Sequence, residues 1–372
     1  MTTTINNEHK KLNVPNLRFK EFEGEWEKCK LSEICTFFSG GTPSSSNKDF
    51  YGGNIAFIRS GELHADSTEL FITQAGFDSS SAKMVEIGDL LLAMYGATSG
   101  DIAVSKIKGA INQAILCIRT KQNKKFIESV WNKHVSKNLR KYLQGGQGNL
   151  SADIVKGISF FFPTLKEQEK IANLVSLLDE RIATQNKIID KLQSLIKGIA
   201  QKIVRSNKPN VRLYECIECS SSTQQESEVC EQGAYPVYGA NGIVGYLDDY
   251  NTEGEAVYII KDGSGVGTVS YVTGKCSATG TLNTLQAKDG YSLQYLYYLL
   301  KVFNFEPYKT GMAIPHIYFK DYGKAKVFCP SYTEQLQYAR LLSAIDSKLS
   351  VEKNTLRNLS LQKQYLLRQM FI

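Results

Sequence analysis

The sequence has few histidines, few cysteines and no long apolar run, and each shortage excludes a class of protein. Four histidines in 372 residues leave little material for general acid–base catalysis. The longest apolar stretches, such as Leu90–Tyr95, fall far short of the roughly 20 residues of a membrane-spanning helix. The polar start, Met1–Asn13, has no apolar core and does not resemble a secretory signal. Eight cysteines are too sparse for a disulfide scaffold, so we expect reduced thiols in a cytoplasmic protein.

The sequence also lacks a complete motif for catalysis or nucleotide binding. It contains no Gly-x-x-x-x-Gly-Lys-Ser/Thr, His-Glu-x-x-His or Gly-x-Ser-x-Gly, and no Asn-Pro-Pro-aromatic tetrad of amino-methyltransferases. Gly265 and Gly267 are expected in a turn between strands rather than in a dinucleotide loop. The spacing Cys216-x-x-Cys219 nominates zinc, but no second pair and no nearby histidine accompany it, so buried or half-buried thiols are the favoured interpretation. We therefore expect a binding protein, not an enzyme, with no metal of its own.

What the sequence does contain is an internal repeat. Pro163-Thr-Leu-Lys-Glu-Gln returns as Pro330-Ser-Tyr-Thr-Glu-Gln, an offset of 167 residues (330 − 163), and the same offset holds without a gap over residues 163–204 and 330–371. Each copy opens with a capping box, Thr164-x-x-Glu167 and Ser331-x-x-Glu334, which marks the start of a helix. The chain is therefore expected to consist of two similar halves.

After each cap, apolar residues recur in steps of four and three, a heptad seam typical of a helix that packs along its length on another helix. One polar residue interrupts each seam at the equivalent place, Gln185 and Glu352. About 38 residues of helix measure roughly 57 Å, too long for one domain to bury, so we expect the two helices to pack on each other. The alternative is a separate core helix in each domain. The predicted helix-packing residues are Ile171, Val175, Leu178, Ile182, Gln185, Ile189, Leu192, Leu342, Ile345, Leu349, Glu352, Leu356 and Leu359.

Two segments ahead of these helices have the composition of mixed α/β domains. Short apolar runs such as Asn54–Ile58 and Ala256–Ile260 are split by turn residues, and each segment ends in a helical stretch, Phe126–Leu143 and Leu293–Phe305. The predicted organisation is a first domain over residues 1–162, a long helix over 163–206, a second domain over 207–329 and a second long helix over 330–372. The predicted fold class is mixed α/β (α+β).

Positive charge is concentrated rather than spread. Residues 119–141 carry eight lysines and arginines against one acid, a net charge of +7 that equals the formal charge of the whole chain. Lys133, Lys137 and Lys141 recur every four residues along one side of the expected helix, beside Arg140. Such a face suits DNA phosphates, although a solvated helix surface is the plain alternative.

Polar, glycine-rich loops supply groups suited to phosphates and base edges, with ordinary surface loops as the alternative. Asn and Gln pair with adenine, and Arg or Lys with guanine. Together with the basic face, the candidate DNA-binding residues are Thr42, Ser44, Ser45, Asn47, Arg59, Tyr95, Thr98, Ser99, Lys133, Lys137, Arg140, Lys141, Gln147, Asn149, Tyr238, Asn241, Lys261, Ser264 and Lys309.

The order and duplication of these motifs resemble the specificity (S) subunits of type I restriction–modification systems, over nearly the whole chain. The residues that carry the resemblance are the duplicated Pro-Thr/Ser-x-x-Glu-Gln helices, Val14–Phe19 with Trp26 and Leu31, Gly40–Ser44, Ile87–Leu91, Asn112-Gln113, Asn149–Ser151 and Tyr235–Gly242.

The resemblance implies two target-recognition domains, each of which reads one half of a split DNA sequence. It implies that the long helices form an antiparallel coiled coil that sets the spacing of the half-sites and docks two modification (methyltransferase) subunits. Those partners bind S-adenosylmethionine, and separate restriction (translocase and nuclease) subunits use ATP and Mg²⁺. For this chain itself we expect neither a cofactor nor a membrane partner. A coiled-coil adaptor for proteins or glycans is the competing interpretation, and an enzyme the third.

Three departures limit how far residues of one half can be equated with residues of the other, and one of them is Lys363, which breaks the second seam. The second half has no clear counterpart of Arg18-Phe19 and Trp26, although Leu213-Tyr-Glu faintly echoes Leu31-Ser-Glu. Residues 313–317 replace the polar stretch at Asn149–Ser151. We therefore expect the two domains to read different sequences.

Overall fold

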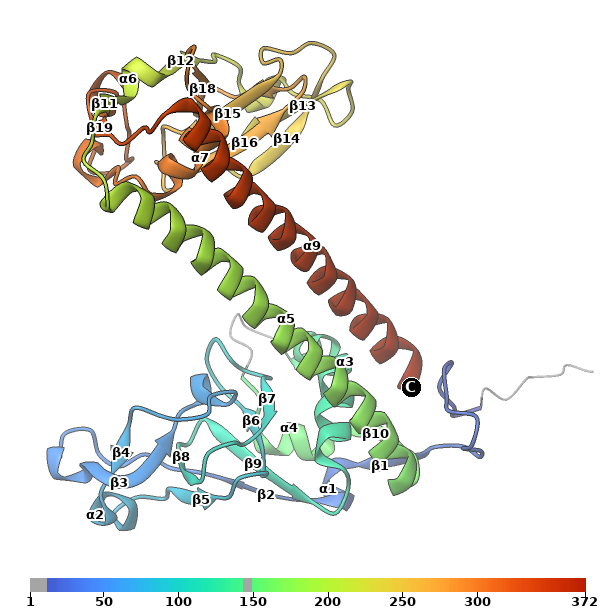
Figure 1. Cartoon of the computed structure of the whole chain (residues 1–372). Coiled ribbons are helices and arrows are strands. Elements are labelled where there is room, and N and C mark those ends of the chain that lie inside the picture. The colour runs from blue at the N-terminus through green and yellow to red at the C-terminus, as the bar shows by residue number, and fades with distance from the viewer. Residues whose placement is uncertain (1–11, 143–148) are drawn as a thin grey trace, which may run out of the picture. The chain divides into compact units, whose positions relative to one another are not determined.

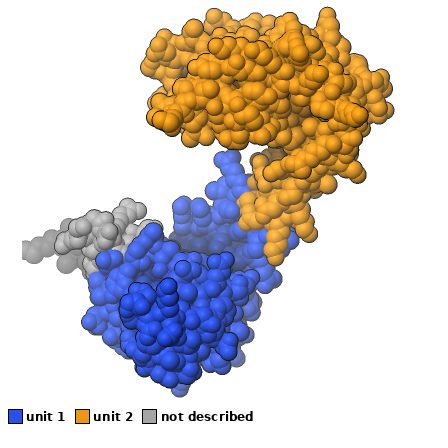
Figure 2. All heavy atoms as spheres, turned by 90° about the vertical axis from the view of Figure 1, so that its left-hand side faces the viewer, with its two compact units in different colours: residues 1–184, 357–372 blue, residues 185–356 orange. Residues whose placement is uncertain are grey.

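A computed structural model of the chain describes residues 12–142 and 149–372, without the side chains of residues 136–142. It divides into two compact units, coloured in Figure 2: residues 1–184 with 357–372, and residues 185–356. Each unit therefore contains one globular domain and parts of both long helices. Within the described ranges, no helix is long and apolar enough to cross a membrane.

The first unit is built on two four-stranded sheets (Figure 1). One has the order β2 (Cys35–Ser39), β9 (Ile115–Thr120), β6 (Leu90–Ala93), β7 (Ile102–Val104), and is antiparallel throughout. The other has the order β4 (Phe71–Ile72), β3 (Tyr51–Ile58), β8 (Gly109–Ile111), β5 (Lys83–Val85). A small pair joins β1 (Glu27–Lys30) to β10 (Ser159–Phe162). The helices are α1 (Leu31–Ile34), α2 (Gln74–Asp78), α3 (Lys124–Tyr142) and α4 (Ala152–Gly157), with short 3₁₀ turns at Lys48–Phe50 and Ser60–Glu62.

The second unit repeats this plan with fewer strands. Its main antiparallel sheet has the order β12 (Ile217–Ser221), β18 (Leu282–Ala287), β15 (Glu255–Ile260), β16 (Val269–Thr273). A second sheet has the order β14 (Gly242–Leu247), β13 (Tyr235–Gly239), β17 (Ser277–Ala278), and β11 (Val211–Arg212) pairs with β19 (Lys326–Val327). The helices are α6 (Leu213–Cys216), α7 (Leu293–Val302) and α8 (Phe319–Tyr322), with 3₁₀ turns at Glu226–Glu228 and Glu306–Tyr308.

The main sheets of the two units have the same strand order, so the repeat predicted from the long helices extends through the domains. The Leu31 amide donates to the Ile158 carbonyl in the first unit, and the Leu213 amide donates to the Ala325 carbonyl in the second. The faint echo of Leu31-Ser-Glu at Leu213 is thus a structural equivalence, since α1 and α6 occupy the same place.

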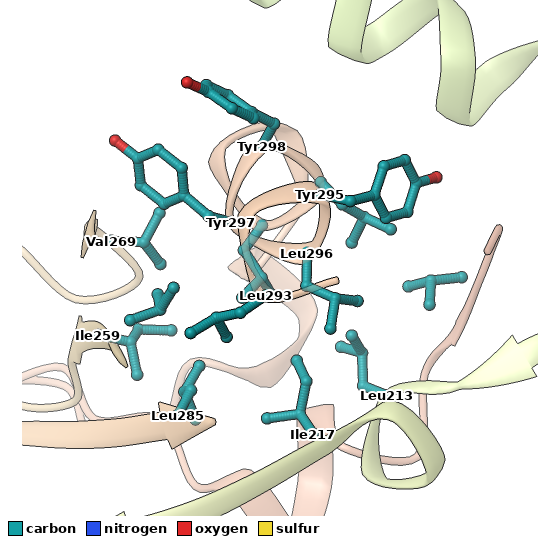
Figure 3. Close-up of a cluster of buried hydrophobic side chains, with 14 of the residues drawn as sticks. Leu213, Ile217, Ile259, Val269, Leu285, Leu293, Tyr295, Leu296, Tyr297 and Tyr298 are labelled. Atoms are coloured by element: carbon teal, nitrogen blue, oxygen red, sulfur yellow. The ribbon is translucent and has the colours of Figure 1, made fainter. Parts of the chain in front are cut away.

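Each unit has its own apolar core between its main sheet and a helix. In the first, Phe126 and Trp131 of α3 are fully buried beside strand residues such as Leu92 and Ile118. In the second, Leu293 and Leu296 of α7 point toward Ile217, Ile259 and Leu285 of the main sheet (Figure 3). Burial of these large side chains is the main favourable contribution to the folding of each domain.

The two long helices are α5 (Leu165–Arg205) and α9 (Tyr332–Met370), and in each unit they belong to the same core. Ile171 and Val175 share the first core with Met370. Ile189 shares the second with Leu342 and Leu349. Direct contacts join the helices as well: Lys363 of α9 forms an ion pair with Asp179 of α5. The prediction that the helices pack on each other is confirmed, and their direction is antiparallel.

The lysine that breaks the second seam is explained by this ion pair. Lys363 and Lys125 both contact the Asp179 carboxylate, the latter at 2.9 Å. Burial opposes ionisation of Asp179, but the hydrogen bonds from the two lysines outweigh it and hold the pKa of the carboxyl below its ordinary value. A charged residue is tolerated in the seam because its partner stands on the facing helix.

The two capping boxes differ in the structure. At the start of α9, the Ser331 hydroxyl accepts from the Glu334 amide (3.4 Å), and Glu334 accepts from the Ser331 amide (3.1 Å), as predicted. At the start of α5, Thr164 caps the Glu167 amide in the same way, but the Glu167 carboxylate accepts two hydrogen bonds from Arg18, at 2.8 Å each. The expected first box is therefore only half formed, because a charged partner from the N-terminal segment takes the carboxylate.

The next residue in each copy, Gln168 or Gln335, joins its long helix to the domain ahead of it. Gln335 accepts a hydrogen bond from the Ser292 amide at the start of α7 and donates to the Pro330 carbonyl, both at 2.9 Å. Gln168 accepts from the Asn123 amide at the start of α3 and donates to the Pro163 carbonyl. Both glutamines are 1% exposed. The repeated Glu-Gln pair is thus a structural joint rather than a binding site.

Candidate nucleic-acid interface

Several of the loops that the sequence nominated converge at one edge of the first domain. The Gly40 amide donates to the Ile115 carbonyl (3.4 Å), and the Gly41 amide donates to the Ile111 carbonyl (3.2 Å). A Cβ atom on Gly40 would lie 1.8 Å from the Ile111 carbonyl oxygen, so only glycine permits this approach. The Thr42 hydroxyl then bonds to the Gln113 side chain. The segment 39–47 is therefore held against the segment 111–115.

The loop between β6 and β7 and the segment before α4 join the same edge. The Met94 amide donates to the Ala114 carbonyl, and the Leu150 amide donates to the Met94 carbonyl, both at 2.8 Å. Residues 39–47, 94–101, 111–115 and 149–151 are named here the first loop cluster. Among its candidate side chains, Thr42 and Asn149 are exposed, and so is Tyr95, at 40%.

The second domain has an equivalent arrangement. The Lys261 amide donates to the Thr281 carbonyl (3.0 Å), the Ile317 amide to the Lys261 carbonyl (2.9 Å), and the Thr279 amide to the Tyr238 carbonyl (2.8 Å). The first two bonds repeat those of Met94 and Leu150 at the offset of 167 residues. Residues 238–241, 261–268, 279–281 and 315–317 are named here the second loop cluster.

The loops 94–101 and 261–268 are copies of each other in backbone as well as position. In the first, Gly100 donates to Ala93; in the second, Gly267 donates to Ile260. The bonds from Ser99 to Gly96 and from Val266 to Gly263 match in the same way. The two loops share a backbone but differ in side chains, Tyr95, Thr98 and Ser99 against Asp262, Gly265 and Val266. Equal backbones with different side chains suit two readers of different ligands.

Some candidate side chains already have partners within the chain. Asn47 accepts from the Asp49 amide (3.1 Å), and the Ser99 hydroxyl donates to the Met94 carbonyl (3.0 Å). Arg59 pairs with Glu62 at 2.8 Å, and the hydrogen bond from Arg59 lowers the pKa of the Glu62 carboxyl. Lys309 pairs with Glu306 at 2.6 Å. These residues shape the loops, and a contact with DNA would have to compete with the internal partner.

Other candidates are open to solvent. Ser44 and Ser45 are exposed; the Ser44 hydroxyl lies 2.8 Å from that of Ser46. In the second cluster, Ser264 and Asn241 are exposed, and Asn241 precedes the tight turn at Gly242. Tyr238 is half-buried against Tyr258, and burial raises the pKa of its hydroxyl. The fold alone does not decide which of these side chains contact DNA, so their role in DNA binding stays a prediction.

The lysines and arginines of residues 119–141 are less available to DNA than their number indicates, because several of them already have partners within the chain. Arg119 pairs with Asp89 at 2.7 Å, and Lys125 pairs with Glu128 and Asp179. The Lys133 ammonium bonds to the main-chain carbonyls of Arg368 and Phe371 at the end of α9, and burial lowers its pKa. Asp89 and Asp179, which lie outside this stretch of the sequence, therefore neutralise part of the positive charge that we expected to bind DNA. Lys137, Arg140, Lys141 and Gln147 lie outside the residues whose side chains the structure describes.

Two side-chain pairings within the clusters could not be predicted from the sequence. Gln113 contacts Thr42 across 71 residues, and His316 bonds Asp262 (2.7 Å) across 54. Both pairs follow from the strand pairing, which the spacing of residues does not encode. In the described residues, no group of His, Cys, Asp or Glu is arranged for a metal ion; Cys216 instead lies 3.9 Å (Sγ–Sγ) from Cys329.

Comparison with known proteins agrees with this architecture. The family profile described as "Type I restriction modification DNA specificity domain" matches residues 23–194 and again residues 210–360. The chain is 27% identical over 210 residues to the EcoR124I/EcoR124II specificity subunit of Escherichia coli, over 54% of this chain and 48% of that protein. It is 25% identical over 284 residues to a putative type I restriction enzyme specificity subunit, MjaX, of Methanocaldococcus jannaschii, over 70% and 64%. The match thus spans about half to two thirds of these relatives' length.

Solved structures show the same fold. The crystal structure of the type I restriction–modification S subunit from M. genitalium superposes with a TM-score of 0.69 at 18% identity, over 96% of this chain and 99% of that one. A structure solved for complex assembly and conformational transition of a type I system superposes with a TM-score of 0.52 at 16% identity, over 92% and 96%.

Proposed function

Since this chain belongs to the family of type I restriction–modification DNA specificity domains, we propose that it recognises a split DNA sequence, with one loop cluster on each half-site. The observation that carries the proposal is the pair of equivalent clusters, whose loops 94–101 and 261–268 are held by matching backbone bonds but carry different side chains. A bipartite reader needs this combination, because the framework sets the approach to the duplex and the side chains set the sequence that is read.

The proposal assigns the long helices to spacing and to partner binding. Several apolar side chains of α5 and α9 are exposed, whereas the seam residues are buried or half-buried: Leu177 (59%), Leu195 (48%), Val351 (57%) and Leu361 (53%). Exposed apolar side chains on the outside of a helical pair suit a protein partner. The partners proposed are two modification subunits, which methylate adenine with S-adenosylmethionine, and restriction subunits that use ATP and Mg²⁺. The chain itself acts without catalysis, in the cytoplasm.

Duplex binding across a range of salt concentrations tests the proposal. The chain is assembled with its modification subunits, and affinity is measured for random duplexes and for a duplex that carries the methylated sequence. The proposal expects a steep loss of affinity with salt, because binding releases counterions from phosphates, and a preference for the methylated sequence at every salt concentration. A flat response to salt and no sequence preference would instead support the coiled-coil adaptor for proteins or glycans.

A further inference from the structure

An exposed apolar loop stands beside the second loop cluster. Met312 is fully exposed, with a relative accessibility of 106%, and Ile314 is 58% exposed. Ala313 between them is exposed as well. Residues 312–314 are named here the apolar tip. Single exposed apolar residues are common on protein surfaces, but three in succession at the end of a loop mark an interaction site more often than chance exposure.

The tip is held rigidly. Thr310 and His316 exchange main-chain hydrogen bonds of 2.9 and 2.7 Å, which close a five-residue loop. The Gly263 amide donates to the Pro315 carbonyl (2.9 Å), and His316 Nδ1 lies 2.7 Å from the Asp262 carboxylate. Gly311 has φ = +88°, and a Cβ atom there would lie 2.3 Å from the Ile314 carbonyl oxygen. The loop is thus preorganised and fastened to the segment 261–268.

The position of the tip beside the second loop cluster favours DNA as its partner. Charge beside the tip is balanced, because Lys309 pairs with Glu306 at 2.6 Å and Asp321 follows Lys320. The backbone bond from Ile317 to Lys261 ties the tip to the loop that we propose reads the second half-site.

We infer that the apolar tip reads thymine in the second half-site through its 5-methyl group. Among base edges, the thymine methyl is the one apolar group, and it lies in the major groove. Contact with Met312 or Ile314 would remove the methyl and the side chain from water together, which stabilises the complex at thymine over other bases. This inference rests on the proposed function and adds a mode of reading that hydrogen bonds do not supply.

The test uses the complex with its modification subunits and a duplex that carries the sequence it methylates. Each thymine of the half-site assigned to the second domain is replaced in turn by deoxyuridine, which deletes only the methyl group. For the wild type, we expect at least one replacement to weaken binding roughly fivefold. For Met312→Ala/Ile314→Ala, we expect weaker binding to the thymine duplex and no further effect of deoxyuridine. Ile87→Ala, which alters a side chain 69% exposed in the first domain, serves as the matched control and should behave as the wild type.

Several results would overturn the inference. A half-site without thymine, a wild-type complex that ignores every methyl deletion, or an equal loss in wild type and double variant would each exclude the contact. A double variant that fails to assemble with the modification subunits would show that the tip binds protein. Because both side chains are exposed and the loop is closed by backbone bonds, the variant should keep its fold, which circular dichroism checks. A wild-type complex that methylates no split sequence would instead refute the proposed function.

Discussion

The Gln185 side chain of α5 donates a hydrogen bond of 3.0 Å to the main-chain carbonyl of Glu352 in α9. Glu352 is the residue of the second copy that is equivalent to Gln185 in the first. The Gln185 side chain also bonds to the Glu352 carboxylate. In an antiparallel pair of equivalent helices, equivalent residues meet only where the two copies are level with each other. The two polar interruptions of the seams are therefore one contact, and they set the register of α5 against α9 in the way that a buried polar pair does in other coiled coils.

Removal of one partner of this pair should weaken the helix pairing more than removal of both. Gln185→Leu leaves the Glu352 carboxylate against an apolar side chain, so we expect a lower Tm than for the wild type. Gln185→Leu/Glu352→Leu should melt above the single variant, because no polar group then faces the seam, and Lys348, which pairs with Glu352 in the wild type, is 61% exposed and returns to solvent. Thermal unfolding followed by circular dichroism measures both. A double variant that melts below the single variant would show that the pair stabilises the helices in another way.

The buried hydrogen bonds of Gln335 should contribute more to the free energy of unfolding than an exposed side chain on the same helix. Gln335→Ala leaves the Ser292 amide at the start of α7 unsatisfied in a buried place, so we expect a loss of about 1–3 kcal/mol in the free energy of unfolding. Gln337→Ala is the matched control, since Gln337 is exposed on the same helix. Urea unfolding of both variants makes the comparison. Equal stability of the two variants would contradict the role assigned to Gln335.

The Asp179 carboxylate should give the first unit a stability that disappears in acid. Its pKa is lowered in the folded protein, so its contribution is present above the unfolded value near 4 and is lost as the pH falls through the folded value. Asp179→Asn should therefore cost about 1–3 kcal/mol at pH 7, and the difference from wild type should shrink below about pH 4. Urea unfolding at a series of pH values measures it. A difference that grows in acid would contradict the assignment.

Periodic and local patterns predicted much of this fold. The heptad seam and the caps were found because a helix repeats its buried face at fixed spacing, and the repeat exposed the two halves. Contacts between distant segments were not predictable in this way. Arg18 pairs with the Glu167 carboxylate, which would otherwise complete the capping box of α5, and Lys133 donates to main-chain carbonyls at the end of α9. Strand order and helix packing bring these residues together. The loop clusters were nominated piece by piece, but their convergence depends on sheet topology, and so does the bond between Thr42 and Gln113.

The proposed ruler role of the long helices makes a metric prediction. Insertion of one heptad after Gln185 and one before Glu352 keeps both seams in register and lengthens the pair by about 10 Å. At roughly 3.4 Å per base pair, the spacer of the methylated sequence should grow by about three base pairs. A four-residue insertion near Gln185 alone also tests the ruler, since the spacer should change. Adenine methylation mapped in cells reads the spacer directly, and an unchanged spacer in the heptad variant would refute the ruler.

The most direct test of the whole account is long-read mapping of methylated adenines in a host that expresses this chain with its modification subunits, repeated for two variants. Thr42→Ala/Asn149→Ala alters the first loop cluster, and Asn241→Ala/Ser264→Ala alters the second. The account predicts one split sequence for the wild type, with the first variant changed or relaxed in one half-site only and the second variant in the other. A methylated sequence without two halves, or a variant that changes both half-sites together, would contradict it.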